Sequence, residues 1–358
     1  MEVDILPITH NNLYPKIYDI GNLYYVYIKA AKGKRYRPEV LKFSANLESN
    51  LIKIQNELIN KNYQTGIYNN FYIYEPKKRL VSALPFRDRI VQHALCNIIG
   101  PLFEAKMIYD SYACRNYKGT HKAVDQTQNF INNAENKWGK AYCLKCDIAK
   151  YFPNIQHDIL KHIIRRTISC SDTLYLLDSI IDSTGEGDSN NRGIPIGNLT
   201  SQLLANVYLN QLDHFAKEVL CEHYYVRYMD DFIFITETKQ HLWKILGQIK
   251  IYLKQNLGLD LNKKTSIFPT NQGVDFCGYR IWSSYKLLRK RSVKTMKRKL
   301  KVYKKKYETG QIELEEINCS IQSWLGHAKH ADTYRLRKKM FNNFILVRKN
   351  SKPITFIN

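Results

Sequence analysis

The chain has 358 residues, more than a single small module needs, which predicts two or three lobes. Its 55 Lys and Arg outnumber 32 Asp and Glu, and the formal net charge of +23 indicates a polyanionic partner. The 44% of hydrophobic and 12% of aromatic residues exclude a disordered chain, and no stretch approaches the roughly 18 uninterrupted apolar residues of a membrane span.

The first 80 residues mix helical and strand-like patterns. Residues 47–59 predict a polar helix, and the aromatic-rich run at 67–74 predicts a strand. A basic run at 77–79 precedes a second predicted strand at 80–83. The acidic start of the chain lacks the positive region of a signal peptide, so we expect a cytoplasmic protein that does not contact a membrane.

The middle of the chain alternates strands and helices. Residues 141–148 predict a strand, 155–167 and 201–220 predict helices, and 224–236 predict two strands around a tight turn. Interspersed elements of both kinds predict an α+β fold with helices on one face of a sheet.

The cysteines give no framework of disulfides or metal ligands. All eight lie in apolar or strand-like stretches, at positions 96, 114, 143, 146, 170, 221, 277 and 319. The pair Cys143 and Cys146 has the spacing of zinc ligands but no second pair to complete a site. We expect reduced core residues, with a zinc site as the alternative.

Residues 286–307 carry twelve Lys and Arg and no acid. Apolar side chains recur there at spacings of three and four, at Val293, Met296, Leu300, Tyr303 and Tyr307. This pattern predicts a helix with one apolar stripe and an otherwise positive surface. Like charges repel along a helix unless an anion offsets them, which favours contact with phosphates. A solvated helix face and an anionic membrane surface are the alternatives.

Two adjacent acids, Asp230 and Asp231, occupy the turn between two apolar strand halves. Desolvation and mutual repulsion make this arrangement costly, and a divalent cation would relieve both effects. An ordinary Asp-rich hairpin turn is the alternative. A third acid, Asp147, ends the strand predicted at 141–148, where its side chain can meet the turn if the strands pair.

Three carboxylates with the backbone carbonyl of Ile148 would suit two Mg2+ ions about 3.5 to 4 Å apart, with Mn2+ as an alternative. Such a pair of ions activates a 3′-hydroxyl and stabilises a departing pyrophosphate. This is the chemistry of nucleotidyl transfer.

The Tyr-Met-Asp-Asp sequence at 228–231 resembles the catalytic box of reverse transcriptases, and residues 146–155 resemble the box with their other catalytic aspartate. Further segments resemble this family in the same order, at 84–95, 111–115, 261–265 and 276–280. The resemblance implies an RNA-directed DNA polymerase with a right-hand fold of fingers, ferredoxin-like palm and helical thumb. The implied domains are fingers and upper palm at 1–135, palm at 136–285 and a basic thumb at 286–358.

The resemblance also assigns residues around a deoxynucleoside triphosphate. Phe152 would exclude a 2′-hydroxyl, and Lys78 and Arg79 would bind the triphosphate. Lys264 would protonate the departing pyrophosphate, although Lys263 is adjacent. Core packing for Phe152 and plain surface charge for the two finger residues are the alternatives. Tyr279 or Arg280 would seat the primer, or pack within a strand.

Residues 193–202 lie partly in this nucleotide pocket, and they carry the most specific resemblance. Most reverse transcriptases have Gln-Gly there and end with Ser-Pro, whereas this chain has Ile196 and Gly197 and ends with Ser-Gln. The pattern resembles the enzymes of diversity-generating retroelements, which are bacterial or phage-encoded and make errors at template adenines. Ile196 cannot make the hydrogen bonds of a glutamine, so we expect polar discrimination to be weakened.

The resemblance implies several partners: a template RNA, the RNA/DNA duplex and a small basic accessory protein, with an oligomeric accessory protein as one alternative. An antiphage defence reverse transcriptase that copies its own noncoding RNA is the nearest rival. A non-catalytic RNA-binding protein on a polymerase scaffold is the rival from another class. The Ser-Gln ending departs from the pattern of retron and group II intron enzymes.

Overall fold

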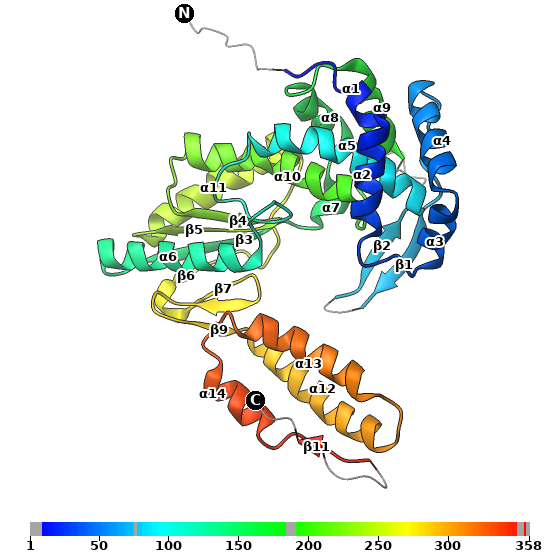
Figure 1. Cartoon of the computed structure of the whole chain (residues 1–358). Coiled ribbons are helices and arrows are strands. Elements are labelled where there is room, and N and C mark those ends of the chain that lie inside the picture. The colour runs from blue at the N-terminus through cyan, green and yellow to red at the C-terminus, as the bar shows by residue number, and fades with distance from the viewer. Residues whose placement is uncertain (1–8, 75–76, 184–190, 349–353, 356–358) are drawn as a thin grey trace, which may run out of the picture. The chain divides into compact units, whose positions relative to one another are not determined.

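A computed structural model describes residues 9–74, 77–183 and 191–348, and the backbone of residues 354–355 (Figure 1). The chain divides into two compact units. The first contains the described residues up to Asn116 together with Cys146–His223 and Ile245–Thr265, and the second contains Tyr117–Lys145, Tyr224–Lys244 and the described residues from Ser266 onward. Within the described ranges, no helix has the length and apolar character needed to cross a membrane.

The first unit is mainly helical. Its α-helices are α1 Tyr14–Tyr18, α2 Ile20–Ala31, α3 Pro38–Ala45, α4 Leu47–Ile59, α5 Phe86–Glu104, α7 Tyr151–Asn154, α8 His157–Arg165, α9 Ser171–Asp182 and α10 Leu199–His214. A π-helix, η1 Phe215–Val219, continues α10, and β1 (Asn69–Ile73) pairs antiparallel with β2 (Arg79–Ala83). Helix α5 packs against α2 and α10 and buries Ile90, Val91 and Leu95, so it forms the centre of this unit.

The second unit contains two antiparallel pairs of strands in one four-stranded sheet. Its elements begin with α6 Thr120–Trp138, β3 Tyr142–Asp147, β4 Tyr225–Tyr228, β5 Asp231–Thr236 and β6 Ser266–Pro269. The strand order is β4-β5-β3-β6, with β4 antiparallel to β5 and β3 antiparallel to β6. Helix α6 packs against β4 and β5 (Figure 1). Strand β3 and helix α11 (Lys239–Leu257) each cross the boundary between the units, so the last two residues of β3 belong to the first unit.

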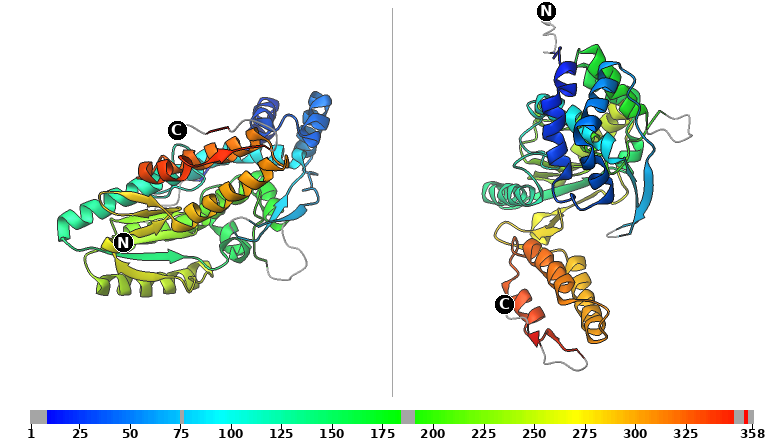
Figure 2. Two further views of the ribbon diagram at one scale, coloured as in Figure 1. Left: turned by 90° about the horizontal axis from the view of Figure 1, so that it is seen from below. Right: turned by 45° about the vertical axis from the view of Figure 1, so that its right-hand side comes forward.

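The rest of the second unit is a three-stranded sheet followed by a helical bundle. These elements are the 3-10 helix η2 Thr270–Gln272, β7 Val274–Phe276, β8 Tyr279–Ile281, β9 Lys286–Leu288, α12 Lys290–Glu308, α13 Leu314–Ala328, α14 Tyr334–Phe341, β10 Ile345–Leu346 and β11 Ile354–Thr355. Helices α12 and α13 lie side by side in all views (Figures 1 and 2).

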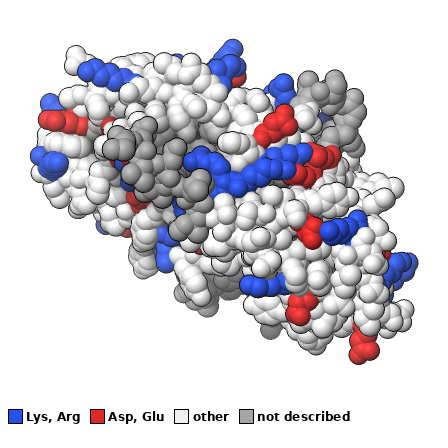
Figure 3. Space-filling model, turned by 90° about the horizontal axis from the view of Figure 1, so that it is seen from above, with Lys and Arg blue, Asp and Glu red and all other residues white. Residues whose placement is uncertain are grey.

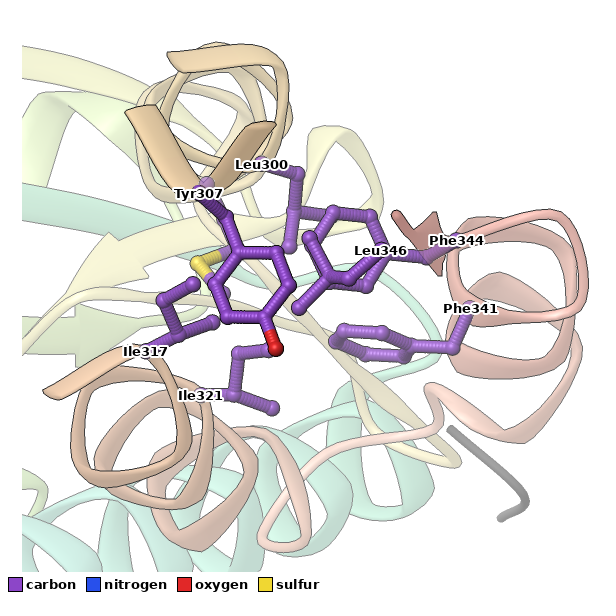
Figure 4. Packing of buried hydrophobic residues seen from close by; sticks show 8 residues of the cluster. Leu300, Tyr307, Ile317, Ile321, Phe341, Phe344 and Leu346 are labelled. Carbon is purple, nitrogen blue, oxygen red and sulfur yellow. The ribbon is translucent and has the colours of Figure 1, made fainter. Parts of the chain in front are cut away.

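The helical bundle has a small core of its own (Figure 4). It buries Met296, Leu300 and Tyr307 of α12, Ile317 and Ile321 of α13, Phe341 of α14, and Phe344 and Leu346 beyond it. Burial of each such side chain contributes about 1.5 to 3 kcal/mol relative to leaving it exposed. The apolar stripe predicted for the basic helix is therefore the face of α12 that packs into this core, although Val293 is only half-buried.

Most predicted elements are confirmed, with differences at their ends. The helix at 47–59 matches α4, and the strands at 141–148 and 224–236 match β3 and the β4–β5 hairpin. The basic helix does not begin at residue 286, because Lys286–Leu288 pair with β8 as β9. The stacked rings of Trp282 and Tyr285, with centroids 4.6 Å apart, lie in the turn that returns the chain to β8.

Other helices differ from the predicted bounds. The helix predicted at 201–220 begins at Leu199 as α10, which buries Thr200 and Ser201, and after His214 it continues as the π-helix η1. Helix α13 ends at Ala328, whose carbonyl accepts a hydrogen bond of 2.7 Å from Thr333 Oγ1.

The cysteines are all free, as expected, but they are not all core residues. Cys143, Cys146 and Cys170 are buried, whereas Cys114, Cys221 and Cys319 are exposed. The three exposed cysteines lie in or near turns or on a helix surface, so apolar neighbours in the sequence did not predict their burial correctly.

Candidate active site

The hairpin between β4 and β5 presents Asp230 and Asp231 from a rigid base. Tyr228 pairs with Asp231 across the two strands, so Met229 and Asp230 form the turn. Met229 has a φ of +57°, a left-handed conformation that is unusual for a residue other than glycine and occurs often at functional sites. Phe232–Ile235 are buried, whereas both carboxylates are half-buried. The hairpin therefore places its two acids at the solvent-accessible end of an apolar sheet.

A buried arginine of β4 supports this turn through a hydrogen bond to its backbone. Arg227 is 0% exposed, and its Nη1 donates a hydrogen bond of 3.0 Å to the carbonyl of Met229. Thr120 Oγ1 donates to the hydroxyl of Tyr228 at 3.1 Å, which ties the same turn to the start of α6. The sequence pattern gave no reason to select Arg227, because a charged residue within an apolar strand half reads as an outward-facing position.

Asp147 is held by the segment that follows α11. Asn262 donates from Nδ2 to Asp147 Oδ2 at 3.0 Å, and the Asn262 N–H donates to the Asp147 carbonyl at 2.7 Å. The Ala149 N–H donates to the carbonyl of Asp260 at 2.9 Å. Asn262 therefore fixes Oδ2 of the Asp147 carboxylate. This bond also sets the direction of the other oxygen, Oδ1.

The two backbone hydrogen bonds between residues 147–149 and 260–262 do not use the carbonyl of Ile148. Ile148 faces Leu261 as an isolated bridge, and the bonds on either side use Asp147 and Ala149. Lys264 is exposed in this turn, and its N–H donates to Asn262 Oδ1 at 3.2 Å. Asn262 thus connects two residues that the sequence singled out, Asp147 and Lys264, and its own role was missed.

The three predicted carboxylates come from two elements of the structure. Asp230 and Asp231 share one hairpin of the second unit, whereas Asp147 belongs to the first unit at the end of β3, the strand next to β5 in the sheet. Among the described residues, no three His, Cys, Asp or Glu side chains are grouped closely enough to hold a metal ion. The donors themselves, carboxylate oxygens and a backbone carbonyl, are the ligands that Mg2+ prefers.

In the first unit, the segment from Gly193 to Gly197 joins two predicted parts of the nucleotide pocket. The Ile194 N–H donates to the Phe152 carbonyl at 3.0 Å, and the Ser82 N–H donates to the Ile196 carbonyl at 2.9 Å. Phe152 and Ile196 are both half-buried. The segment therefore connects α7, which contains Phe152, to β2.

Gly197 is required at this contact by its backbone and by its surroundings. Its φ is +134°, and a Cβ there would lie 2.9 Å from the Ser82 carbonyl oxygen and 3.1 Å from Val81 Cγ1. Any other residue would displace β2 or distort the segment.

Lys78 directly precedes β2 and Arg79 is its first residue, and both are exposed. The ammonium of Lys78 lies 4.3 Å from the ring centroid of Tyr72 on the paired strand β1. Arg79 is three residues before Ser82, so the strand that begins with this cation also contacts Ile196.

A second turn of the second unit lies near the acidic hairpin. Cys277 and Gly278 connect β7 to β8 with φ values of +48° and +90°. Burial and the nearby charge of Asp231 raise the pKa of the Cys277 thiol, so it stays neutral. The charge effect places this turn in the electrostatic environment of Asp231.

Tyr279, which follows this turn, packs inside the unit. It is 0% exposed, and its hydroxyl donates to the His327 carbonyl at 2.9 Å and lies 2.8 Å from His327 Nδ1. The rings of His121 and His330 stack nearby with centroids 3.4 Å apart. Tyr279 is therefore a packing residue, whereas Arg280 is exposed and donates to the Gln272 carbonyl at 3.0 Å.

Positive charge differs in its distribution over the molecule. On the face shown in Figure 3, Lys and Arg are scattered and several lie beside Asp or Glu. Helix α12 instead has no acid before Glu308, and nine of its Lys and Arg side chains are exposed: Lys290, Arg291, Lys294, Lys297, Arg298, Lys301, Lys304, Lys305 and Lys306.

Comparison with known proteins identifies the family. Residues 67–281, more than half of the chain, match the family described as reverse transcriptase (RNA-dependent DNA polymerase). Protein YkfC of Escherichia coli is 28% identical over 287 residues, which cover 69% of this chain and 74% of YkfC. The group II intron-encoded protein LtrA of Lactococcus lactis is 24% identical and is matched over 75% of this chain and 54% of its own length.

A further relative and a solved structure were also matched. The putative COX1/OXI3 intron 2 protein of Saccharomyces cerevisiae is 23% identical over 260 residues, which are 29% of its length. The structure of apo telomerase from Candida tropicalis has a TM-score of 0.51 at 14% identity and is matched over 82% of this chain and 64% of its own length, which supports the α+β fold of a right-hand polymerase. The chain belongs to the reverse transcriptase family, the RNA-directed DNA polymerases.

Proposed function

We propose that the chain makes cDNA from a dedicated template RNA by two-metal nucleotidyl transfer. Asp147, Asp230 and Asp231, with the Ile148 carbonyl, would bind two Mg2+ ions, or Mn2+ as an alternative. Two bound cations supply Lewis-acid stabilisation of the attacking 3′-hydroxyl and of the departing pyrophosphate. The observation that carries this proposal is the acidic turn of the β4–β5 hairpin, whose half-buried carboxylates stand on buried strands in a chain of this family.

The chain's own groups would divide the remaining work. Asn262 holds Asp147 Oδ2, so this carboxylate keeps one orientation. Lys264 would donate a proton to the departing pyrophosphate, while Lys78 and Arg79 would bind the triphosphate of the incoming nucleotide. Phe152 would occupy the space of a 2′-hydroxyl and so select deoxynucleotides. The domain boundaries expected from the sequence, including the thumb at 286–358, remain predictions.

The exposed Lys and Arg of α12 would contact the phosphates of the template–primer duplex. Cations on one helix face that follow a phosphate backbone release counterions on binding, which makes affinity fall with salt. The small core of the helical bundle fixes the opposite face of α12, so the cations project from a supported surface.

We further propose that copying is error-prone at template adenines, as in a diversity-generating retroelement. Ile196 lies in the segment that joins Phe152 to β2 and offers only its backbone carbonyl to that contact. A glutamine side chain there would add hydrogen-bonding groups beside the incoming nucleotide. Its absence removes polar discrimination between correctly and incorrectly paired bases.

Primer extension on a defined RNA template with Mg2+ tests the chemistry, with a variant carrying both Asp230→Asn and Asp231→Asn as control. Sequencing of the products from wild type and Ile196→Gln tests the fidelity proposal. We expect fewer misincorporations opposite adenine in Ile196→Gln. Equal error spectra would refute the role of Ile196, whereas metal-dependent synthesis absent from the double variant would still support the chemistry.

The similarity to LtrA favours a second candidate, an enzyme that acts with a group II intron RNA. Sequencing of RNA and DNA that co-purify with the chain separates the candidates. A template RNA whose cDNA differs from it at adenines supports the retroelement, with its accessory protein as a co-purifying partner. An intron RNA supports the second candidate, and a noncoding RNA without adenine errors supports an antiphage defence enzyme. Bound RNA without cDNA supports a non-catalytic RNA-binding protein.

A further inference from the structure

A cavity of about 620 Å3 lies entirely within the first unit, away from every residue assigned to the polymerase chemistry. Its walls come from the end of α5 and the residues after it, the end of α8, the last turns of α10 and the π-helix η1. Its lining contains apolar side chains such as Met107, Ile163 and Val207 together with polar ones. A mixed lining of this size suits a ligand with both an apolar face and a charged group.

Two cations line the cavity and influence each other. Lys106 Nζ donates to Thr167 Oγ1 at 3.0 Å, and Arg166 Nη1 donates to Gln211 Oε1 at 3.3 Å. Burial and the charge of Arg166 lower the pKa of Lys106. Two positive groups that repel each other in a partly enclosed space would both gain from an anion between them.

A buried amide fixes one wall of the cavity. The Lys106 carbonyl accepts hydrogen bonds from Asn210 Nδ2 at 3.0 Å and from His214 Nε2 at 2.9 Å. The first bond fixes the orientation of the Asn210 amide, because a flipped amide would place two oxygens against each other. Asn210 is 7% exposed, and its Oδ1 is buried, so the residue holds the backbone after α5 against α10 and is not itself a contact for a ligand.

The carboxylate of this cavity is already engaged. Among the described lining residues, Glu218 alone is acidic, and its Oε1 lies 2.5 Å from His214 Nδ1. His214 has an oxygen atom within hydrogen-bonding distance of each ring nitrogen, an arrangement that favours the protonated ring. Burial opposes this charge, but the bonds to Glu218 and the Lys106 carbonyl outweigh it and raise the pKa of His214. The acidic side chain among the described lining residues is therefore paired with His214, and Lys106 and Arg166 are the other charged residues of the lining.

The π-helix η1 forms the part of the cavity wall that contains Glu218. Its five residues, Phe215–Val219, directly follow His214 and bring Glu218 back over the ring. The ring of Phe215 stacks on Tyr252 with centroids 4.1 Å apart, which fixes the irregular turn against α11. Single π-turns are rare and occur often at functional sites.

We propose that this cavity binds a nucleotide, with its phosphate at Lys106 and Arg166. The base would lie against the apolar wall of Met107, Ile163 and Val207. The nucleotide is either free or an unpaired residue of a bound RNA. The site does not depend on the polymerase reaction.

Calorimetric titration of the full chain with the four nucleoside 5′-monophosphates tests the free form, in EDTA so that metal-dependent binding at the acidic turn is absent. Arg166→Gln removes one cation of the cavity. The matched control is Arg165→Gln, because Arg165 is the neighbouring arginine, pairs with Asp178 at 2.5 Å and does not line the cavity. We expect Arg166→Gln to weaken binding about tenfold, as loss of a bond to a charged group does, and Arg165→Gln to bind like wild type.

Photocrosslinking of single-stranded RNA that contains 4-thiouridine tests whether the cavity binds an unpaired nucleotide of a bound RNA. Crosslinks to residues 103–108, 163–167 or 207–218 that disappear in Arg166→Gln, without binding of monophosphates, support an unpaired RNA nucleotide. Equal binding by Arg166→Gln and wild type in both experiments overturns the proposal. So does inorganic phosphate that binds as tightly as the nucleotides, because the base would then contribute nothing. The circular-dichroism spectrum and the thermal unfolding of Arg166→Gln, measured beside those of wild type, confirm that this variant is folded.

Discussion

The acidic β4–β5 hairpin and the basic helix α12 differ in how much of the chain around their charged groups is buried. In the hairpin, the strand residues Tyr225–Arg227 and Phe232–Thr236 are all buried, and the four turn residues between them are half-buried. In α12, only three of nineteen residues are buried, and the cations project on flexible stems.

This difference separates chemistry from binding. Metal-dependent catalysis needs carboxylates held within a fraction of an ångström, which a turn on buried strands provides. Phosphate contact needs only charge near a polyanion, which exposed lysines provide without a fixed geometry. Single changes in the hairpin should therefore have large effects, and single changes on α12 should have small, additive ones.

The largest effect is expected for Asp231→Asn. The substitution keeps the shape of the turn and removes one negative oxygen donor, which should cost several kcal/mol of transition-state stabilisation, or about 10³-fold in rate. Single-turnover primer extension with Mg2+ measures the loss. Glu237→Gln, an exposed acid just beyond β5, is the control and should extend primers normally. Comparable rates for Asp231→Asn and wild type would remove this residue from the active site.

A smaller but still large effect is expected for Arg227→Met. Methionine fills much of the buried volume but leaves the Met229 carbonyl without its donor, which should lower the free energy of unfolding by about 1 to 3 kcal/mol. Urea denaturation measures the change, and primer extension should fall as the turn loses its support. Arg289→Met, in the second unit but half-buried and paired with Asp275, is the comparison and should be milder. If the two variants unfold alike, Arg227 does not support the turn.

Local patterns predicted the regular elements and the acids well, because both are encoded over a few adjacent residues. The alternation around Asp230 and Asp231 predicts two strands and a turn, and the polar period at 47–59 predicts α4. Helix ends were less accurate. Ala328 ends α13 because Thr333 bonds back to its carbonyl, and no apolar spacing reports such a bond.

The parts of the site that sequence could not supply depend on contacts between distant residues. Asn262 and Asp147 are 115 positions apart, and only the fold places the amide on the carboxylate. Ser82 and Ile196 are likewise joined across the first unit by a backbone bond, which no side-chain pattern records. Arg227 was overlooked because burial of a charged side chain contradicts the usual pattern of a strand.

Asn262→Ala tests whether the third acid needs the same rigidity as the hairpin. Loss of one hydrogen bond to a half-buried carboxylate should cost about 1 kcal/mol, or about fivefold in rate, with the substrate KM unchanged. Asn256→Ala, an exposed asparagine on α11, is the matched control. A shift of the Mg2+ dependence toward higher concentration in Asn262→Ala would show that the amide orients Asp147, whereas a fall in thermal stability alone would make it a structural residue.

The smallest effect per residue is expected on α12. Lys297→Gln combined with Lys301→Gln removes two exposed cations spaced four residues apart, so both lie on one face of the helix. The slope of log affinity against log salt for an RNA/DNA duplex should decrease by about two, close to one unit for each phosphate that no longer has a lysine beside it. Lys42→Gln with Lys53→Gln, two exposed lysines of α3 and α4, removes the same charge from the first unit. An equal decrease in both double variants would mean that net charge alone governs duplex binding. The position of the lysines on α12 would then have no particular role, whereas the prediction for the acidic turn would be unaffected.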